Sequence, residues 1–161
     1  MKIKIITTGG TIDKIYFDQK SEYQIGDPQA EGVLQRSNSM LETEVQSIMR
    51  KDSLDLTDED RELIRKTVSN DPNPRIVITH GTDTMIKTAG VLKEIKDKTI
   101  VLTGSMYPAQ FRDSDAVFNI GCAITAAQIL APGVYITING KVFNPEKTRK
   151  NIELNRFEEM T

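Results

Sequence analysis

The stretch Ile3-Lys4-Ile5-Ile6-Thr7-Thr8-Gly9-Gly10-Thr11-Ile12 decides the fold of this 161-residue chain. Its isoleucines form a short apolar strand close to the N-terminus, and the strand runs directly into a Thr-Gly-Gly-Thr turn. Two consecutive glycines allow positive φ, so the chain can turn sharply and bring its backbone close to a ligand. The residues alone leave two interpretations open: the start of a ligand site, or a tight strand exit with solvent-facing threonines.

Downstream segments repeat the pattern of an apolar strand followed by a helix. A buried-type strand is predicted at 76–78, and further strands are predicted at 99–102 and 134–138. An Asn139-Gly140 hairpin turn then leads to Val142-Phe143. Residues 33–38 are predicted to be a short strand or extended connector, and helices are predicted at 40–50, from Thr57 to about 70, at 85–95 and at 114–130. This alternation predicts an α/β fold: a three-layer, open, mostly parallel sheet with helices on both faces, Rossmann-like or flavodoxin-like.

A polar segment follows the first glycine turn and contains two partly apolar runs, Tyr16-Phe17 and Tyr23 to Ile25. These runs are predicted to pair as an irregular hairpin that Gly26 and Pro28 close. A hairpin that leaves directly from a glycine turn is a candidate mobile flap over a site. An ordinary solvated hairpin fits the same residues.

The composition argues against several classes of protein. A net charge of −2 supplies no basic field for nucleic acid or for an anionic membrane. A single histidine, His80, and a single cysteine, Cys122, cannot build an all-protein nitrogen and sulfur metal site or an intrachain disulfide. Without a signal-peptide pattern or a membrane-length apolar run, we expect a cytoplasmic protein that needs no metal or other cofactor. We expect Cys122 to pack in the core and His80 to cap its strand.

Three of the predicted strands end in similar turns of glycine and hydroxyl residues, at 8–11, 81–84 and 103–105. The carboxyl ends of parallel strands meet at one edge of a sheet, so these turns should converge into a site for a small polar ligand. A nucleotide phosphate is one possible ligand, although neither G-x-x-x-x-G-K-[ST] nor G-x-G-x-x-G occurs. The other chemistry is attack by a threonine hydroxyl, which needs a base and a group that orients it.

The order and spacing of these turns resemble a known family. Thr8-Gly9-Gly10-Thr11-Ile12, followed by His80-Gly81-Thr82-Asp83-Thr84, resembles the two signatures of the bacterial-type L-asparaginase family. Thr103-Gly104-Ser105-Met106, with Asp115-Ala116 and Asn119 after it, resembles that family's next block. The resemblance covers essentially the whole chain. It implies that residues 1–161 form a single domain of the family's N-terminal α/β type, without the C-terminal domain of other members.

The resemblance also implies roles for individual residues. Thr11 would attack the side-chain amide of L-asparagine and form an acyl-enzyme while ammonia leaves. Thr82, Asp83 and Lys150 would activate the second step or share the role of nucleophile, with backbone N–H groups at Thr11 and Thr82 stabilising the oxyanion. Lys147 lies close enough in the sequence to Lys150 to be the alternative lysine.

Substrate binding would fall to residues of the same turns and of the hairpin. Ser53, in a Ser-x-Asp loop, would bind the α-carboxylate, and Asp83 would pair with the α-ammonium. The turn residues Gly10, Gly81 and Ser105 would line the site, and Tyr23, in a Tyr-x-x-Gly setting, would act from the flap.

Two functions are therefore carried forward. The first is an amidohydrolase that converts L-asparagine to L-aspartate and ammonia, with poor use of glutamine because Leu54 replaces a glutamine found in some members. The second is a non-catalytic module that binds a small amino acid or amide. In both cases we expect a small-molecule ligand, no nucleic-acid or membrane partner, and a homodimer or larger homo-oligomer.

Overall fold

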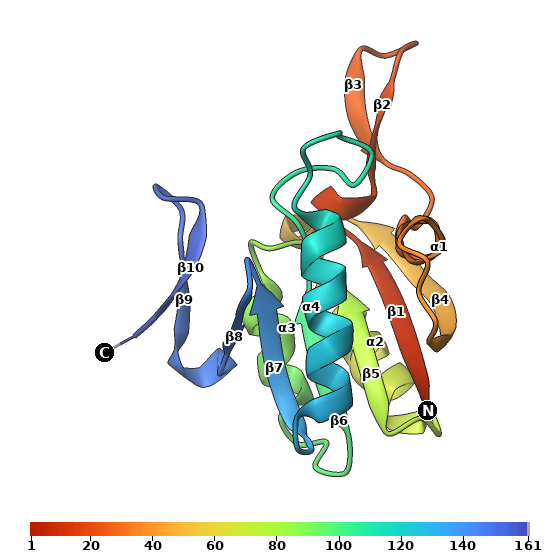
Figure 1. Ribbon diagram of the computed structural model, residues 1–161. Helices are drawn as coiled ribbons and strands as arrows, with labels where there is room; N and C mark the ends of the chain where they lie inside the picture. The colour runs from red at the N-terminus through yellow and green to blue at the C-terminus, as the bar shows by residue number, and fades with distance from the viewer. Residues whose placement is uncertain (161) are drawn as a thin grey trace.

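A computed structural model describes residues 1–160 and contains one six-stranded sheet with two separate hairpins (Figure 1). The order of strands in the sheet is β4-β1-β5-β6-β7-β8, and all neighbours are parallel except β7 and β8. The sheet strands are β1 (Lys2–Gly9), β4 (Glu42–Lys51), β5 (Arg75–Thr79), β6 (Thr99–Thr103), β7 (Gly133–Ile138) and β8 (Lys141–Phe143). The predicted open, mostly parallel α/β sheet is confirmed.

Helices cover both faces of the sheet. They are α1 (Ala30–Arg36), α2 (Asp58–Asn70), α3 (Met85–Leu92) and α4 (Ala116–Ile129). Figure 1 shows α4 in front of the sheet and α2 and α3 behind it. Adjacent strand residues face opposite layers, so Ile5 packs with α1 and α4, whereas Ile6 packs with α2 and α3. The same alternation in β5 and β6 divides the apolar core into two clusters of buried side chains.

The segment from 30 to 51 differs from the prediction. Residues 33–38 belong to helix α1, and residues 40–50, predicted to be a helix, form most of strand β4 at the edge of the sheet. Val45 packs against one core cluster, whereas Ile48 and Met49 pack against the other. A register irregularity between Ser47 and Lys51 allows these neighbours to share a face, which is why the apolar spacing imitates a helix.

Two antiparallel hairpins flank the carboxyl edge of the sheet. The first is β2 (Lys14–Phe17) with β3 (Glu22–Ile25), which pair as predicted and rise beyond the sheet edge in Figure 1. The second is β9 (Thr148–Asn151) with β10 (Arg156–Glu159), which lies beyond β8. Phe157 of β10 packs against Phe143 of β8, with ring centroids 6.1 Å apart, and this contact anchors the second hairpin to the sheet.

Within residues 1–160, no helix has the length and apolar character that crossing a membrane requires.

Candidate active site

The glycine turns at the ends of β1 and β5 are in direct backbone contact, because neither carries a side chain at the point of approach. Gly10 has φ +85°, and a Cβ atom built on it would lie 2.4 Å from the backbone nitrogen of Gly81. A Cβ built on Gly81 would lie 2.6 Å from Oγ of Ser53, which follows β4. Because β4, β1 and β5 are neighbours in the sheet, the loops that hold Ser53, Thr11 and Thr82 form one contiguous rim.

Gly10→Ala is expected to destabilise the protein by more than about 2 kcal/mol. A left-handed conformation alone costs an L-residue roughly 1–2 kcal/mol, and the new Cβ would collide with rigid backbone rather than with a flexible side chain. Gly90→Ala is the matched control, because a Cβ at this exposed α3 position meets nothing within 4 Å and should stabilise the helix by about 0.5–1 kcal/mol. Urea unfolding of both variants measures the difference; equal stabilities would show that the Gly10–Gly81 approach carries no strain.

Lys150 connects the second hairpin to the end of β5. Its Nζ donates hydrogen bonds to Oγ1 of Thr82 at 2.8 Å and to Oδ1 of Asp83 at 2.6 Å. Thr82 is buried and Asp83 is partly exposed, so the group has one sheltered and one open side. The structure therefore brings together three of the residues expected to be catalytic, although Lys150 lies 67 positions from Asp83. Lys147, the alternative lysine, is exposed.

Thr11 and Ser53 occupy the same rim on the β1 and β4 side. Thr11 begins a short 3-10 helix directly after Gly10 and is half-buried. Ser53 is 1% exposed, and its Oγ has no hydrogen-bond partner among residues 1–160. A buried hydroxyl without a partner loses hydration free energy, so it is suited to bind a polar ligand group in this position.

The flap carries Tyr23 on β3, and this side chain is packed between two aromatic rings. Tyr16 on β2 lies 5.5 Å away and Phe111, in the loop after β6, lies 5.9 Å away between ring centroids, both edge-to-face. Such pairs contribute roughly 0.5–1.5 kcal/mol beyond their buried area. The flap in this structure is therefore held against the loop that also contains Ser105.

Ser105 and the neighbouring block maintain the shape of their own loop. The Ser105 hydroxyl is buried and donates its proton to the backbone carbonyl of Tyr107, so only its lone pairs are available to a ligand. The carboxylate of Asp115 accepts from the backbone N–H groups of Met106 and Tyr107, and Asn119 donates to the carbonyl of Gly104 at 2.9 Å. These contacts give Asp115 and Asn119 a structural role at the end of β6.

His80 is fully buried and neutral. Its Nδ1 lies 2.7 Å from the carbonyl oxygen of Gly81, which can only accept, so Nδ1 carries the proton and Nε2 accepts from the Thr88 hydroxyl at 2.8 Å. Burial lowers the pKa of His80 to about 4. The imidazole thus fixes the carbonyl of Gly81, in keeping with the structural role expected for it. Cys122, expected in the core, is instead only partly buried on α4.

Asp13 joins the two ends of the flap. Its Oδ1 accepts from the backbone N–H of Gln29 at 2.8 Å, and its backbone carbonyl accepts from the N–H of Gly26 at 2.8 Å. Burial raises the pKa of the Asp13 carboxyl group to about 7, although the hydrogen bond from Gln29 and the charge of Arg50 oppose this shift. A titratable group therefore lies at the base of the flap, two residues after Thr11.

Asp13→Asn is expected to remove a pH dependence of stability. Between pH 3.8 and about 7 the folded protein retains a proton that the unfolded chain has lost, so wild-type stability falls as pH rises through this range. The change amounts to about 4 kcal/mol for a shift of this size, and Asn keeps the oxygen that accepts from Gln29. In urea unfolding at about pH 5 and pH 8, the stability of the Asp13→Asn variant relative to wild type should be greater at the higher pH. If the free energy of unfolding changed with pH by the same amount in both proteins, the raised pKa of Asp13 would be refuted.

One buried residue that shapes this site was not predicted from the sequence. Arg61 on α2 is 2% exposed and contacts the loops of Ser53 and Thr84. The signal was its spacing, because Arg61 precedes Ile64 by three positions and Val68 by seven and so shares their inward face.

An open α/β sheet with hydroxyl, amine and carboxylate groups gathered at its strand ends defines an α/β protein with a small polar-ligand site. The chain belongs to the asparaginase family, since the family model described as asparaginase, N-terminal, matches residues 2–158. No group of three or more potential metal-ligating side chains occurs in the described part of the chain.

Several similar proteins are asparaginases by name. The L-asparaginase of Thermococcus kodakarensis is 34% identical over 98% of this chain and 51% of that protein. Its thermostable L-asparaginase structure superimposes with a TM-score of 0.85, over 99% of this chain and 51% of the other. The probable cytoplasmic L-asparaginase of Campylobacter jejuni gives a TM-score of 0.77 at 29% identity, over 98% and 51% of the two chains. The chain thus spans about half the length of these relatives.

Proposed function

We propose that this chain is an amidohydrolase that cleaves the side-chain amide of L-asparagine to L-aspartate and ammonia. The observation that carries the proposal is the hydrogen-bonded group of Lys150, Thr82 and Asp83, next to the turn that presents Thr11. The names of the relatives, L-asparaginase among them, support the same substrate. They also include glutaminase-asparaginases, so selectivity between asparagine and glutamine is a separate proposal, based on Leu54.

In the first step, Oγ1 of Thr11 attacks the amide carbon and its proton is transferred to the departing ammonia. The product is an ester between Thr11 and the aspartyl group, with developing negative charge stabilised by backbone N–H groups of Thr11 and Thr82. In the second step, water attacks this ester. Oγ1 of Thr82 would accept the water proton while passing its own proton to the uncharged amine of Lys150, and a proton would return by the same route to Oγ1 of Thr11 as L-aspartate leaves.

The zwitterionic end of the substrate would be bound by groups of opposite charge and by free donors. Asp83 uses Oδ1 for Lys150, and a carboxylate can accept further bonds, so Oδ2 is available for the α-ammonium. The unpartnered Oγ of Ser53 would donate to the α-carboxylate. Gly10 and Gly81 allow the loops of Thr11, Thr82 and Ser53 to approach one another closely and would line the site with their backbone. Tyr23 would cover the site from the flap.

The test is an assay of ammonia and L-aspartate formed by the purified protein from L-asparagine, with L-glutamine as comparison. We expect turnover of L-asparagine and much slower turnover of L-glutamine. Added hydroxylamine should divert the acyl-enzyme to aspartyl hydroxamate. Saturable binding of L-aspartate without ammonia release would instead support the non-catalytic module.

We further propose a cytoplasmic homo-oligomer whose described residues act as one domain. Support for the compartment is the name of the Campylobacter jejuni protein, and support for assembly is the open side of the site at Asp83. Light scattering of the purified chain would measure the assembly; a monomer with full activity would contradict it.

A further inference from the structure

Arg61 is a buried cation that the proposed reaction does not use. Its guanidinium group is always charged and is costly to bury unless its N–H groups find acceptors. Nη1 donates to the carbonyl oxygens of Leu56 at 2.8 Å and Thr57 at 3.1 Å, and Nη2 donates to Oγ1 of Thr84 at 3.1 Å. Its ion partner Asp58 is 81% exposed and 3.5 Å away, so the charge is satisfied mainly by loop oxygens.

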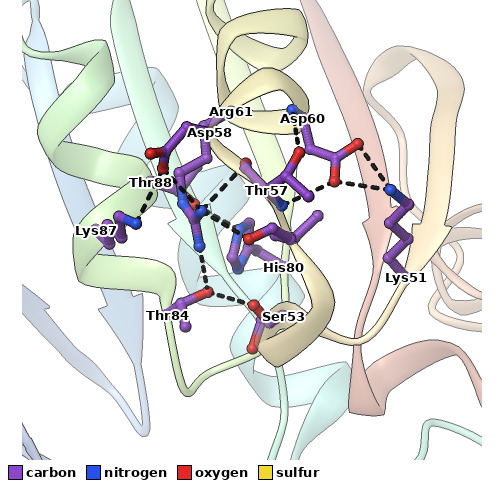
Figure 2. Close-up of polar contacts among 11 residues, drawn as sticks. Lys51, Ser53, Thr57, Asp58, Asp60, Arg61, His80, Thr84, Lys87 and Thr88 are labelled. Atoms are coloured by element: carbon purple, nitrogen blue, oxygen red, sulfur yellow. Dashed lines mark hydrogen bonds and ion pairs between the residues drawn. The ribbon is translucent and has the colours of Figure 1, made fainter.

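The directions of the hydrogen bonds around Thr84 are determined by chemistry. A guanidinium group only donates, so Thr84 Oγ1 accepts from Arg61. The same hydroxyl lies 2.7 Å from the carbonyl oxygen of Ser53, which only accepts, so its proton is directed there. Figure 2 shows this path from Arg61 on α2, through Thr84 at the start of α3, to the Ser53 loop.

The path connects the two loops proposed to bind opposite ends of the substrate. Ser53, proposed for the α-carboxylate, lies within three residues of Leu56, whose carbonyl Arg61 holds. Asp83, proposed for the α-ammonium, immediately precedes Thr84. One rigid group on α2 thus contacts both loops. A zwitterion has a fixed distance between its charges, so binding depends on the separation of these loops.

We infer that Arg61 is a positioning residue that acts through Thr84 to set the spacing between the Ser53 and Asp83 loops, and thereby the affinity for an α-amino acid. This inference rests on the proposed function. It assigns Arg61 to binding of the zwitterion rather than to cleavage of the amide. Its loss should therefore raise KM for L-asparagine more than it lowers kcat.

Thr84→Val tests the path with the least disturbance, because valine keeps the shape of threonine and removes only the hydroxyl. We expect KM to rise about tenfold, the effect of losing roughly 1.4 kcal/mol of binding, and kcat to fall less than about threefold. Thr84→Ser restores a hydroxyl and should return KM to within about twofold of wild type. An unchanged KM in Thr84→Val, with a lower melting temperature only, would overturn the inference.

Arg61→Lys and its combination with Thr84→Val test whether the two residues act together. Lysine keeps the charge but replaces the planar fork by a single nitrogen, so it cannot hold both loops in the same geometry. We expect the double variant to have about the same KM as the worse single variant; additive effects would overturn the inference. Arg65→Met is the control, because Arg65 lies on the same helix and bonds to Glu62 at the surface.

Calorimetric binding of L-aspartate separates failure of this inference from failure of the proposed function. Wild-type protein that neither hydrolyses L-asparagine nor binds L-aspartate would refute both. If wild type binds without hydrolysis, the Kd for L-aspartate replaces KM and must rise about tenfold in Thr84→Val. If wild type is active and Thr84→Val keeps the same KM and Kd, only the role of Arg61 and Thr84 is refuted.

Discussion

Thr11→Val is expected to abolish ammonia release from L-asparagine, lowering kcat by about three orders of magnitude or more. Valine keeps the branched shape at this half-buried position and removes the oxygen proposed to form the covalent bond to the substrate. L-aspartate should still bind, because the zwitterion contacts proposed at Ser53 and Asp83 are untouched. A continuous assay for ammonia, with calorimetry for L-aspartate, measures both effects.

Thr11→Ser and Thr82→Val complete this experiment. Serine retains a hydroxyl, so Thr11→Ser should keep measurable activity. Thr82→Val should slow the second step, so the aspartyl ester accumulates on Thr11 and appears in the mass spectrum of the quenched protein. An ester on Thr82 in the Thr11→Val protein would reverse the assigned roles, and undiminished ammonia release by both valine variants would refute threonine catalysis.

The central sheet could be predicted because its signals are local. The runs at 76–78, 99–102 and 134–138 are short and mostly apolar, as parallel strands covered on both faces are, and each forms a strand of the sheet. The start of α2 was equally clear, since Thr57 and Asp60 form a capping box with bonds of 3.2 and 2.9 Å. Strand β4 could not be predicted in this way, because it lies at the edge of the sheet and its irregular register divides its apolar residues between two faces.

The candidate site could be predicted only in part, because some of its contacts are local and others connect distant segments. Convergence of the glycine turns followed from the rule that parallel strands end at one edge, and the sheet order confirms it. Placement of Ser53 at that edge depended on β4, which was predicted as a helix. Lys150 lies on a hairpin outside the main sheet, and no periodicity in the tail indicates that it folds back to Thr82.

Lys150→Met is expected to lower kcat by about 10²–10⁴, the usual contribution of a positioned acid or base. Lys150 is 12% exposed in its side chain and donates to both Thr82 and Asp83, so methionine removes the proposed proton carrier and leaves Asp83 without this partner. Steady-state assays of ammonia, with circular dichroism to check the fold, measure the effect. Lys147→Met is the matched control, three positions away and exposed, and should retain wild-type kcat.

Lys150→Arg decides between two ways in which Lys150 could act. Arginine keeps a positive charge and several donors toward Thr82 and Asp83, but it does not give up its proton in a protein. If Lys150 must accept a proton from Thr82 or water, the Lys150→Arg variant should be nearly as inactive as the Lys150→Met variant. Recovery of wild-type kcat in the arginine variant would mean that the charge beside Thr82 suffices, and that the proton leaves by another route.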